Sequence, residues 1–500
     1  MKITKKLFWS KIEDFTQSEL ELINQKLTFN DTFDKSNYFK YYKDRNAILV
    51  LSGLLPILQS AFGDNFELTK VYNDEQFDVP IDIVKLEGMT YWEHQESAIR
   101  AILQNSKGIV QVPTRGGKTE IVLGSIANFL QLYPDFTYLI ITPTLKIFYQ
   151  FYNRALLRGF DKNLISLIGD GNKSITDQTK IVIASIDTLY NIVSKRNPDD
   201  RIYQYLSNVD CLFVDEVQMI SAPSFFHTVL SLKNLKRAYG VSGTPFRSKV
   251  LDLNLHPRDA ICIGLFEKLI YKVDYDVLKE RNQISSGYIT MLESPKNTTP
   301  YSKWFDWATV YKHEITDNEN RNNLIASIAK KFSLLNLKTL ILVQRINHGK
   351  TLLKLLSNSN IRVAFSSGQG NFDSDLKNYN GNPLEDFING KLDVLIGSTI
   401  FDLGVDVPST NLIIIAGGGG ASYIKNVQRA ARTLMLNPES NNRVFCIDFN
   451  DIHHPFTKKH SRQRLKDVLD NGWQYVDYNQ FLQMVMQVVE FKESYQANFN

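Results

Sequence analysis

The stretch IVQVPTRGGKTE at residues 109–120 decides the fold, because an apolar strand runs directly into a glycine-rich loop and then into a helix. The glycines Gly116 and Gly117 let backbone N–H groups curl around phosphate oxygens. In such a loop the Lys118 side chain reaches the β- and γ-phosphates of a nucleotide, and the Thr119 hydroxyl binds Mg²⁺. Apolar residues then recur at helical spacing, which predicts an amphipathic helix after the loop.

The loop departs from the strict pattern Gly-x4-Gly-Lys-Thr. Val112 stands at the position of the first glycine, and Arg115 lies inside the loop. Short motifs also occur by chance, so a glycine-rich turn on the surface is the alternative interpretation of this segment. The motifs that follow in the chain distinguish a phosphate-binding loop from a surface turn.

Composition is that of an ordinary globular protein of two to four domains, at about 100–200 residues each. The chain has 500 residues, 43% of them hydrophobic, and a net charge of only +4. No apolar run approaches the roughly 18–20 residues of a membrane span, and the N-terminus lacks the apolar stretch of a signal peptide. We therefore expect no membrane partner and a cytoplasmic protein. The cysteines lie in apolar runs, which predicts buried thiols and neither disulfides nor a zinc site: Cys211, Cys262 and Cys446.

The order of apolar runs predicts two α/β halves. Strands and helical patterns alternate from about residue 86, as expected for parallel sheets with crossover helices. The expected fold is α/β, with four parts: a small α+β module at 1–85, a first parallel-sheet domain at 86–250, a second at 251–455, and a helical extension at 456–500.

Two short motifs follow predicted strands of the first half. Asp215 and Glu216 end the apolar run CLFV, where a carboxylate at the tip of a neighbouring strand would hold Mg²⁺ and the next would activate water. The sequence SGTP at 242–245 places small hydroxyls on a turn near the same edge. Each has a plain alternative, because acidic pairs cap loops and Ser, Gly and Pro favour turns.

The second half supplies an acidic residue and two arginines. Thr399 follows a predicted strand, and Asp406 lies in the segment GVDVP. Gln428, Arg429 and Arg432 follow in QRAAR. Arginines that reach a γ-phosphate raise the rate of NTP hydrolysis by about 10³–10⁵. The alternative is a solvated helix face.

In this order the segments resemble superfamily 2 helicases. YWEHQ is similar to the family's adenine-reading motif, VPTRGGKT to motif I, DEVQ to motif II, SGTP to motif III, GSTIFDLGVDVP to motif V and QRAAR to motif VI. The resemblance implies two RecA-like domains in tandem that bind ATP and Mg²⁺. It assigns ATP binding to Gln95, Pro113, Thr114, Arg115, Gly116, Gly117, Lys118, Thr119 and Asp406, catalysis to Lys118, Asp215, Glu216, Gln428, Arg429 and Arg432, and Mg²⁺ to Thr119 and Asp215.

The chain looks most similar to the UvsW-type phage helicases, with RecG-like enzymes more distant. That subgroup implies a monomeric ATP-dependent DNA helicase or translocase that remodels forks or four-way junctions by branch migration, in replication, recombination and repair. An RNA helicase or a duplex DNA translocase is the alternative, because these motifs contact only the backbone. A nucleic-acid clamp with weak hydrolysis is an alternative of another class.

The resemblance also nominates nucleic-acid contacts. Hydroxyls and a guanidinium at strand ends bind phosphates in the family, which points here to Thr144, Ser185, Arg345 and Thr399. A hydroxyl at a strand end can equally cap a helix. In the N-terminal module the segment NYFKYYKDR combines aromatic rings with the cations Lys40, Lys43 and Arg45, which suits stacking on bases. Its alternative is an edge strand with aromatic residues in the core.

One departure concerns motif VI. The family pattern is Gln-x-x-Gly-Arg-x-x-Arg, whereas Ala431 replaces the glycine and Met435 stands at the last arginine. Our hypothesis is that Arg432 contacts the γ-phosphate, while Arg429 assists it or supports the fold.

Overall fold

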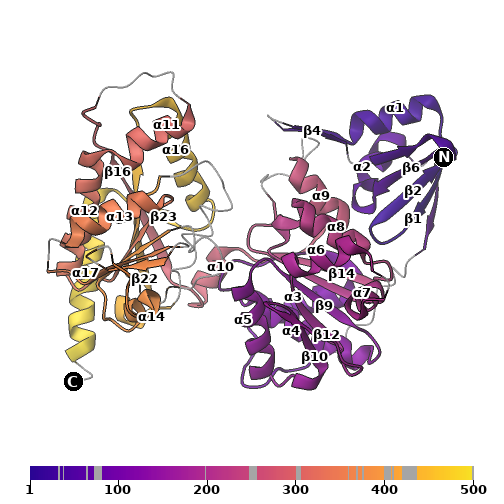
Figure 1. The fold of residues 1–500 in the computed structure, drawn as a ribbon, viewed down its shortest axis with the longest axis horizontal. Helices are drawn as coiled ribbons and strands as arrows, with labels where there is room; N and C mark the ends of the chain where they lie inside the picture. Colours follow the sequence, from indigo (N-terminus) through magenta and orange to yellow (C-terminus); the bar gives the residue numbers. More distant parts are fainter. Residues whose placement is uncertain are drawn as a thin grey trace. The chain divides into compact units, whose positions relative to one another are not determined.

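The computed structural model describes most of the chain as two compact units, Met1–Val273 and Asp274–Asn500 (Figure 1). The described residues are 1–31, 34–37, 39–63, 66–71, 82–197, 199–246, 256–299, 306–357, 360–367, 370–373, 375, 377–398, 407, 410–418 and 436–497. Among them, no helix combines the length and the apolar character needed to cross a membrane.

The first unit begins with the expected small α+β module. Its five-stranded sheet has the order β5-β6-β2-β1-β7. The strands are β1 (Lys2–Lys5), β2 (Trp9–Glu13), β5 (Phe39–Tyr42), β6 (Ala47–Leu51) and β7 (Glu67–Lys70), with a separate hairpin of β3 (Thr28–Asp31) and β4 (Asp34–Asn37). Helices α1 (Gln17–Lys26) and α2 (Leu55–Phe62) complete it. A capping box starts α1, in which Thr16 and Glu19 bond each other's backbone N–H groups.

An eight-stranded sheet follows in the first unit, with the order β11-β10-β12-β9-β13-β14-β8-β15. All neighbours in it are parallel except β10 and β11. The strands are β8 (Lys107–Gln111), β9 (Tyr138–Thr142), β10 (Ile165–Gly169), β11 (Asn172–Lys173), β12 (Ile181–Ser185), β13 (Cys211–Asp215), β14 (Arg237–Ser242) and β15 (Leu269–Lys272). The helices are α3 (Glu93–Gln104), α4 (Lys118–Leu132), α5 (Leu145–Leu157), α6 (Ile186–Lys195), α7 (Arg201–Ser207), α8 (Pro223–Ser231) and α9 (Pro257–Phe266). Helices cover both faces, so the strands are buried and read as continuous apolar runs.

The N-terminal module and this sheet share one apolar core. The backbone of Gly53 lies so close to α9 that a Cβ atom would stand 1.8 Å from the Ile263 carbonyl oxygen. Lys107 at the start of β8 donates to the Leu7 carbonyl and forms an ion pair of 2.8 Å with Glu267. Burial alone would raise the pKa of Glu267, but Lys107 and Lys5 hold it below its usual value. The module is therefore built into the first unit rather than tethered to it.

The second unit contains an eight-stranded sheet of the order β19-β18-β20-β17-β21-β22-β16-β23. All neighbours are parallel except β18 and β19. The strands are β16 (Ser286–Glu293), β17 (Thr339–Leu342), β18 (Val363–Ser367), β19 (Gly370–Phe372), β20 (Val394–Gly397), β21 (Leu412–Ile415), β22 (Arg443–Asn450) and β23 (Gln474–Tyr475). The helices are α10 (Tyr275–Glu280), α11 (Trp307–Tyr311), α12 (Glu319–Leu334), α13 (Ile346–Ser357), α14 (Pro383–Ile388), α16 (Pro455–Leu469) and α17 (Tyr478–Ala497), with one π-helical turn at Lys312–Thr316.

The expected fold of two tandem parallel-sheet domains with a small α+β domain is confirmed. Two expected boundaries differ from the units found. Strand β15 joins the first sheet, so the first unit extends to Val273 and past the expected end at residue 250. The segment 456–500, expected as a helical extension, supplies α16, α17 and the edge strand β23 of the second unit. The three cysteines are buried, as their apolar surroundings predict.

A buried ion network fixes α16 to the second sheet. Both Arg464 nitrogens that face β22 bond the Asp448 carboxylate, at 2.8 and 3.0 Å, and one also lies 3.4 Å from Asp451. Arg321 of α12 binds Asp451 at 3.1 Å and donates to the Ala416 carbonyl at 2.6 Å. Arg321, Arg464 and both carboxylates are at most 3% exposed. Each buried charge in the network is therefore stabilised by its ion-pair partners and not by solvent.

We expect Arg464→Met to lower the free energy of unfolding by about 3–5 kcal/mol, because it leaves a buried carboxylate without its cation. Urea denaturation of the full chain measures the loss. Arg462→Met on the same helix is the matched control, because Arg462 is exposed and its change should stay within about 0.5 kcal/mol. Equal stability of the two variants would contradict the structural role of Arg464.

Candidate nucleotide and nucleic-acid sites

The strand order of the first sheet gathers three motifs at one edge. Strands β13, β14 and β8 are adjacent and parallel, so their carboxyl ends share that edge. The loop 112–117 follows β8, Asp215 ends β13, and Ser242 ends β14. Segments that lie more than 100 residues apart in the chain thus meet where nucleotides bind in open α/β sheets.

The loop after β8 has the backbone of a phosphate cradle. Gly116 N–H donates to the Pro113 carbonyl at 3.0 Å, and α4 begins at Lys118. Arg115 has φ 77° and Gly117 has φ 78°, both in the left-handed region. The N-terminus of a fifteen-residue helix thus lies directly behind the loop, with its first N–H groups free to meet an anion.

Gln95, which the resemblance assigns to ATP binding, packs against this loop. A Cβ atom on Gly117 would stand 2.0 Å from Nε2 at the flexible end of the Gln95 side chain, and the left-handed φ of 78° favours glycine at this position. The Gln95 Oε1 atom accepts a hydrogen bond of 2.9 Å from Trp92 N–H. Next to it, the buried His94 bonds the Gly116 carbonyl at 2.7 Å through Nε2. Sequence analysis missed His94, although its place beside Gln95 in YWEHQ is a usable signal.

Asp215 and Glu216 lie at the end of β13. Asp215 is buried, and burial together with the negative charge of Glu216 raises the Asp215 pKa to about 7, while Lys118 acts in the opposite direction. Glu216 has a left-handed backbone, with φ 52°, and accepts a 2.6 Å hydrogen bond from Gln218 Nε2. A buried carboxylate with a raised pKa is suited to bind a cation, because a nearby positive charge stabilises the ionised form of the carboxylate.

The turn after β14 lies against the phosphate loop. Val112 N–H donates to the Ser242 carbonyl at 3.0 Å, and a Cβ atom on Gly243 would stand 3.3 Å from Thr114 N. Thr244 N–H donates to Ser242 Oγ at 2.9 Å, whereas the buried Thr244 hydroxyl has no partner within the described residues. The phosphate loop and the turn after β14 are thus in direct contact.

The chemistry of the residues at this sheet edge suits a nucleotide with bound Mg²⁺. The glycine cradle leaves room that a side chain would fill, and Lys118 supplies positive charge. Thr119 and the Asp215 carboxylate are oxygen donors of the kind that Mg²⁺ prefers.

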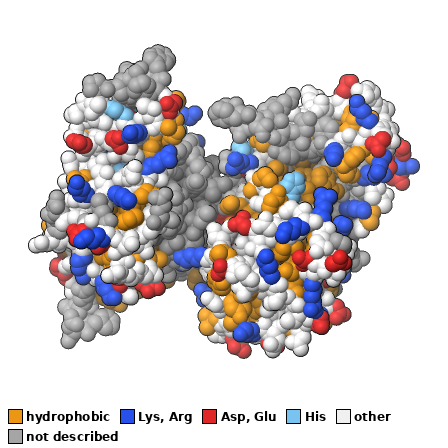
Figure 2. Space-filling view, viewed as in Figure 1, with side chains coloured by type: hydrophobic (Ala, Val, Ile, Leu, Met, Phe, Trp, Pro, Cys, Tyr) orange, Lys and Arg blue, Asp and Glu red, His pale blue; other side chains and the backbone are white. Residues whose placement is uncertain are grey.

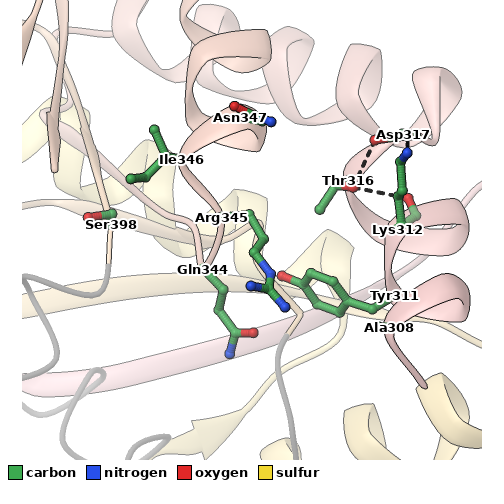
Figure 3. Close-up of a pocket in the computed structure, with 10 residues that line it drawn as sticks. All are labelled: Ala308, Tyr311, Lys312, Thr316, Asp317, Gln344, Arg345, Ile346, Asn347 and Ser398. Atoms are coloured by element: carbon green, nitrogen blue, oxygen red, sulfur yellow. Dashed lines mark hydrogen bonds and ion pairs between the residues drawn. The ribbon is translucent and has the colours of Figure 1, made fainter. Parts of the chain in front are cut away.

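In the second unit, a cavity of about 570 Å³ lies at the carboxyl edge of the sheet (Figure 3). It is lined by residues that include Tyr311, Lys312, Gln344, Arg345, Asn347 and Ser398. The Arg345 guanidinium lies 5.9 Å from the centre of the Tyr311 ring, and the Tyr311 hydroxyl donates to the Gly417 carbonyl at 2.6 Å. Arg345, nominated for nucleic-acid binding, is therefore exposed in a cavity with further polar side chains. Tyr311 and Lys312, which lie between β16 and α12, were not predicted from the sequence.

The other nominated contacts are placed as follows. Thr144 caps α5, and its hydroxyl accepts from Ile147 N–H at 3.4 Å. Ser185 is buried at the end of β12. Lys40, Lys43 and Arg45 are exposed, and Lys40 Nζ lies 4.9 Å from the Tyr42 ring centre. Outside the described residues lie Thr399, Asp406, Gln428, Arg429 and Arg432.

Comparison with known proteins agrees with the resemblance. Residues 88–247 match the family model "Type III restriction enzyme, res subunit", and residues 317–435 match the model "Helicase conserved C-terminal domain". The ATP-dependent DNA helicase uvsW of Enterobacteria phage T4 is 22% identical over 410 residues, which are 77% of this chain and 76% of that protein. The DNA 3'-5' translocase XPB2 of Sulfurisphaera tokodaii is 23% identical over 372 residues, or 68% of this chain and 78% of that protein.

Among solved structures, that of S. cerevisiae Dbp5 bound to RNA and ADP BeF3 shares the fold. The TM-score is 0.53 at 14% identity, over 80% of this chain and 93% of that one. The two matched models and the fold define a helicase with tandem RecA-like domains. The chain resembles the helicases of superfamily 2, with the uvsW helicase of phage T4 among its relatives.

Proposed function

We propose that the protein is an ATP-dependent DNA helicase or translocase that acts on branched DNA, such as forks and four-way junctions. The observation that carries the proposal is the meeting of the phosphate loop, Asp215-Glu216 and the Ser242 turn at one sheet edge, in a chain of this family. The similarity to a phage DNA helicase over 77% of the chain supports DNA as the substrate.

In this proposal the first unit binds Mg²⁺ and ATP with residues 113–119, Gln95, Asp215 and Glu216. Lys118 neutralises phosphate charge, Asp215 and Thr119 hold the metal ion, and Glu216 orients and deprotonates the attacking water. Gln428, Arg429, Arg432 and Asp406 complete the site from the second domain. Cycles of ATP binding and hydrolysis then move the two domains against each other and along a strand.

The nucleic-acid strand is proposed to follow the carboxyl edges of the two sheets. Thr144, Ser185, Arg345 and Thr399 would contact its phosphates without reading sequence. The structure gives Arg345 the best exposure of the three described residues, whereas the Thr144 hydroxyl already caps α5 and Ser185 is buried. We therefore rank Arg345 first among these contacts.

A substrate panel tests the proposal. ATP turnover and strand displacement are measured on a forked DNA, a four-way junction, a linear duplex and an RNA duplex. We expect the forked and four-way DNA to stimulate turnover most. Stimulation by RNA alone would favour an RNA helicase, equal stimulation by linear duplex would favour a duplex translocase, and absent turnover on every substrate would favour a clamp.

The N-terminal module is proposed to hold the branch point with Lys40, Lys43 and Arg45. Deleting residues 1–85 is a poor test, because the module shares its apolar core with α9 and the first sheet. We expect the triple substitution of these exposed cations by Gln to weaken binding to four-way DNA about tenfold and to reduce its salt dependence, while turnover on single strands persists. Fluorescence anisotropy measures both affinities.

A matched control removes three other cations of the module, Lys6, Lys26 and Lys70. That variant should bind four-way DNA as the wild type does, because lysines outside the proposed contact release no counterions. Equal affinity of the two triple variants for the junction would remove the proposed role of Lys40, Lys43 and Arg45.

A further inference from the structure

Helix α16 of the second unit carries a one-sided row of cations on its outer face. Pro455, Lys458, Lys459, Arg462, Gln463 and Lys466 line a shallow groove of about 520 Å³. They recur at intervals of three and four residues, which places them on one face of the helix. All four cations are exposed, and none forms an ion pair with another described residue.

The opposite side of α16 attaches the helix to the sheet, and the cation row takes no part in that attachment. Arg464 points inward to Asp448 of β22, and Ser461 and Val468 are buried beside it. The helix contains a single acidic residue, Asp467, which is 1% exposed and accepts a 2.6 Å hydrogen bond from Gln463. No acidic residue of α16 itself therefore lies with the cations on the outer face.

The row also works against the helix itself. Lys458 and Lys459 lie in the N-terminal half of α16, whose first turn has no acidic residue, although the helix dipole favours negative charge there. Lys458 and Arg462, and then Arg462 and Lys466, are like-charge pairs four residues apart, an arrangement that destabilises helices. The pKa of the neighbouring His460 is lowered by burial and by the charges of Arg464 and Lys459. The row thus has a local cost to the stability of α16.

Local concentration of charge matters here because the surface as a whole is mixed. Blue and red side chains are interspersed over the drawn face of both units (Figure 2), and the net charge is only +4. On such a mixed surface, four exposed cations on one helix face form a local positive patch that attracts a polyanion.

We infer that the outer face of α16 binds the phosphate backbone of a duplex arm of the nucleic-acid substrate. From Lys458 to Lys466 the helix rises about 12 Å, at about 1.5 Å per residue. One strand of a duplex presents three to four phosphates over roughly that length, at about 3.4 Å each. None of the residues that line the groove is aromatic, so it lacks the stacking platforms of single-strand sites. This inference rests on the proposed function, which supplies nucleic acid as the substrate class.

The test replaces three of these cations in the full-length protein, as K459Q/R462Q/K466Q. Binding to a forked DNA and to a single strand is measured by fluorescence anisotropy over about 50–200 mM salt. We expect the slope of log K against log salt for the fork to fall in magnitude by up to about 2.7, which is about 0.9 per lost contact. Single-strand affinity and basal ATP turnover should match the wild type.

The control K330Q/K331Q/K354Q removes the same charge from α12 and α13. Those helices pack on the other face of the sheet, where Phe445, Ile447 and Phe449 point, opposite to Asp448 and α16. The control should leave the slope unchanged. Because all three α16 cations are exposed and their mutual repulsion is relieved, the test variant should melt at or above the wild-type temperature, which separates lost contacts from lost folding.

Two outcomes would overturn the inference alone: a wild-type slope in K459Q/R462Q/K466Q, or an equal loss in the control. An equal loss of fork and single-strand affinity would likewise overturn it, because the row would then not be specific for a duplex arm. Failure of the wild-type protein to bind or respond to any nucleic acid would instead overturn the proposed function.

Discussion

Lys118→Ala is expected to lower ATP turnover by at least about 10²–10³, the cost of removing one electrostatic donor from a preorganised site. Lys118 is the first residue of α4, directly after the glycine cradle, and its charge already opposes the raised pKa of Asp215. Without it, the loop loses the lysine that the resemblance places on the β- and γ-phosphates. Steady-state ATP hydrolysis at saturating forked DNA measures the effect.

Two comparisons make this result specific. Lys162→Ala removes an exposed lysine from the same unit and should leave turnover unchanged. The Lys118→Ala protein should melt at the wild-type temperature, because no hydrogen bond or ion pair described for the fold uses this side chain. Normal turnover in Lys118→Ala would mean that the loop after β8 does not bind the nucleotide.

Arg432→Ala is expected to lower the rate of hydrolysis by about 10³–10⁵, the range for an arginine that stabilises the transition state of phosphoryl transfer. The resemblance places Arg432 in motif VI, where Met435 stands at the position of the last arginine. One arginine would then carry what two share in the family. ATP affinity should change far less than kcat, because the contact strengthens in the transition state.

Arg429→Ala separates the two arginines. We expect it to lower kcat less than Arg432→Ala does, because Arg429 is proposed to assist. Single-turnover hydrolysis and binding of a fluorescent ATP analogue give kcat and affinity for both variants. Wild-type turnover in Arg432→Ala would contradict the assignment, and a larger loss in Arg429→Ala would exchange the two roles.

Much of the nucleotide site could be predicted because its signals are local. The apolar strand before residue 112, the glycines at 116 and 117 and the apolar spacing of α4 all lie within one short segment. Asp215 could be predicted as well, since a carboxylate that ends a buried parallel strand reaches the same edge as the loop. Strand β9 is likewise a continuous apolar run, which is the local signal of a buried strand.

Other features could not be predicted because they depend on partners far away in the chain. Lys107 starts a buried strand, and only the folded chain brings Leu7 and Glu267 to its ammonium group. Strand β15 is short and partly exposed, so nothing in its sequence shows that it extends the first sheet beyond residue 250. For Thr144 the sequence left a phosphate contact and a helix cap as alternatives, and the structure shows that its hydroxyl caps α5.

The sequence by itself determined the family, the order of the domains and the residues around the phosphate loop, because these follow from strand and helix periodicity and from short motifs. Only the tertiary structure decided that Gln95 and His94 support that loop, that the N-terminal module is part of the first unit, and that α16 turns Arg464 inward and four cations outward. The physical reason is that burial and ion pairing are properties of contacts between distant segments, which periodicity along the chain does not encode.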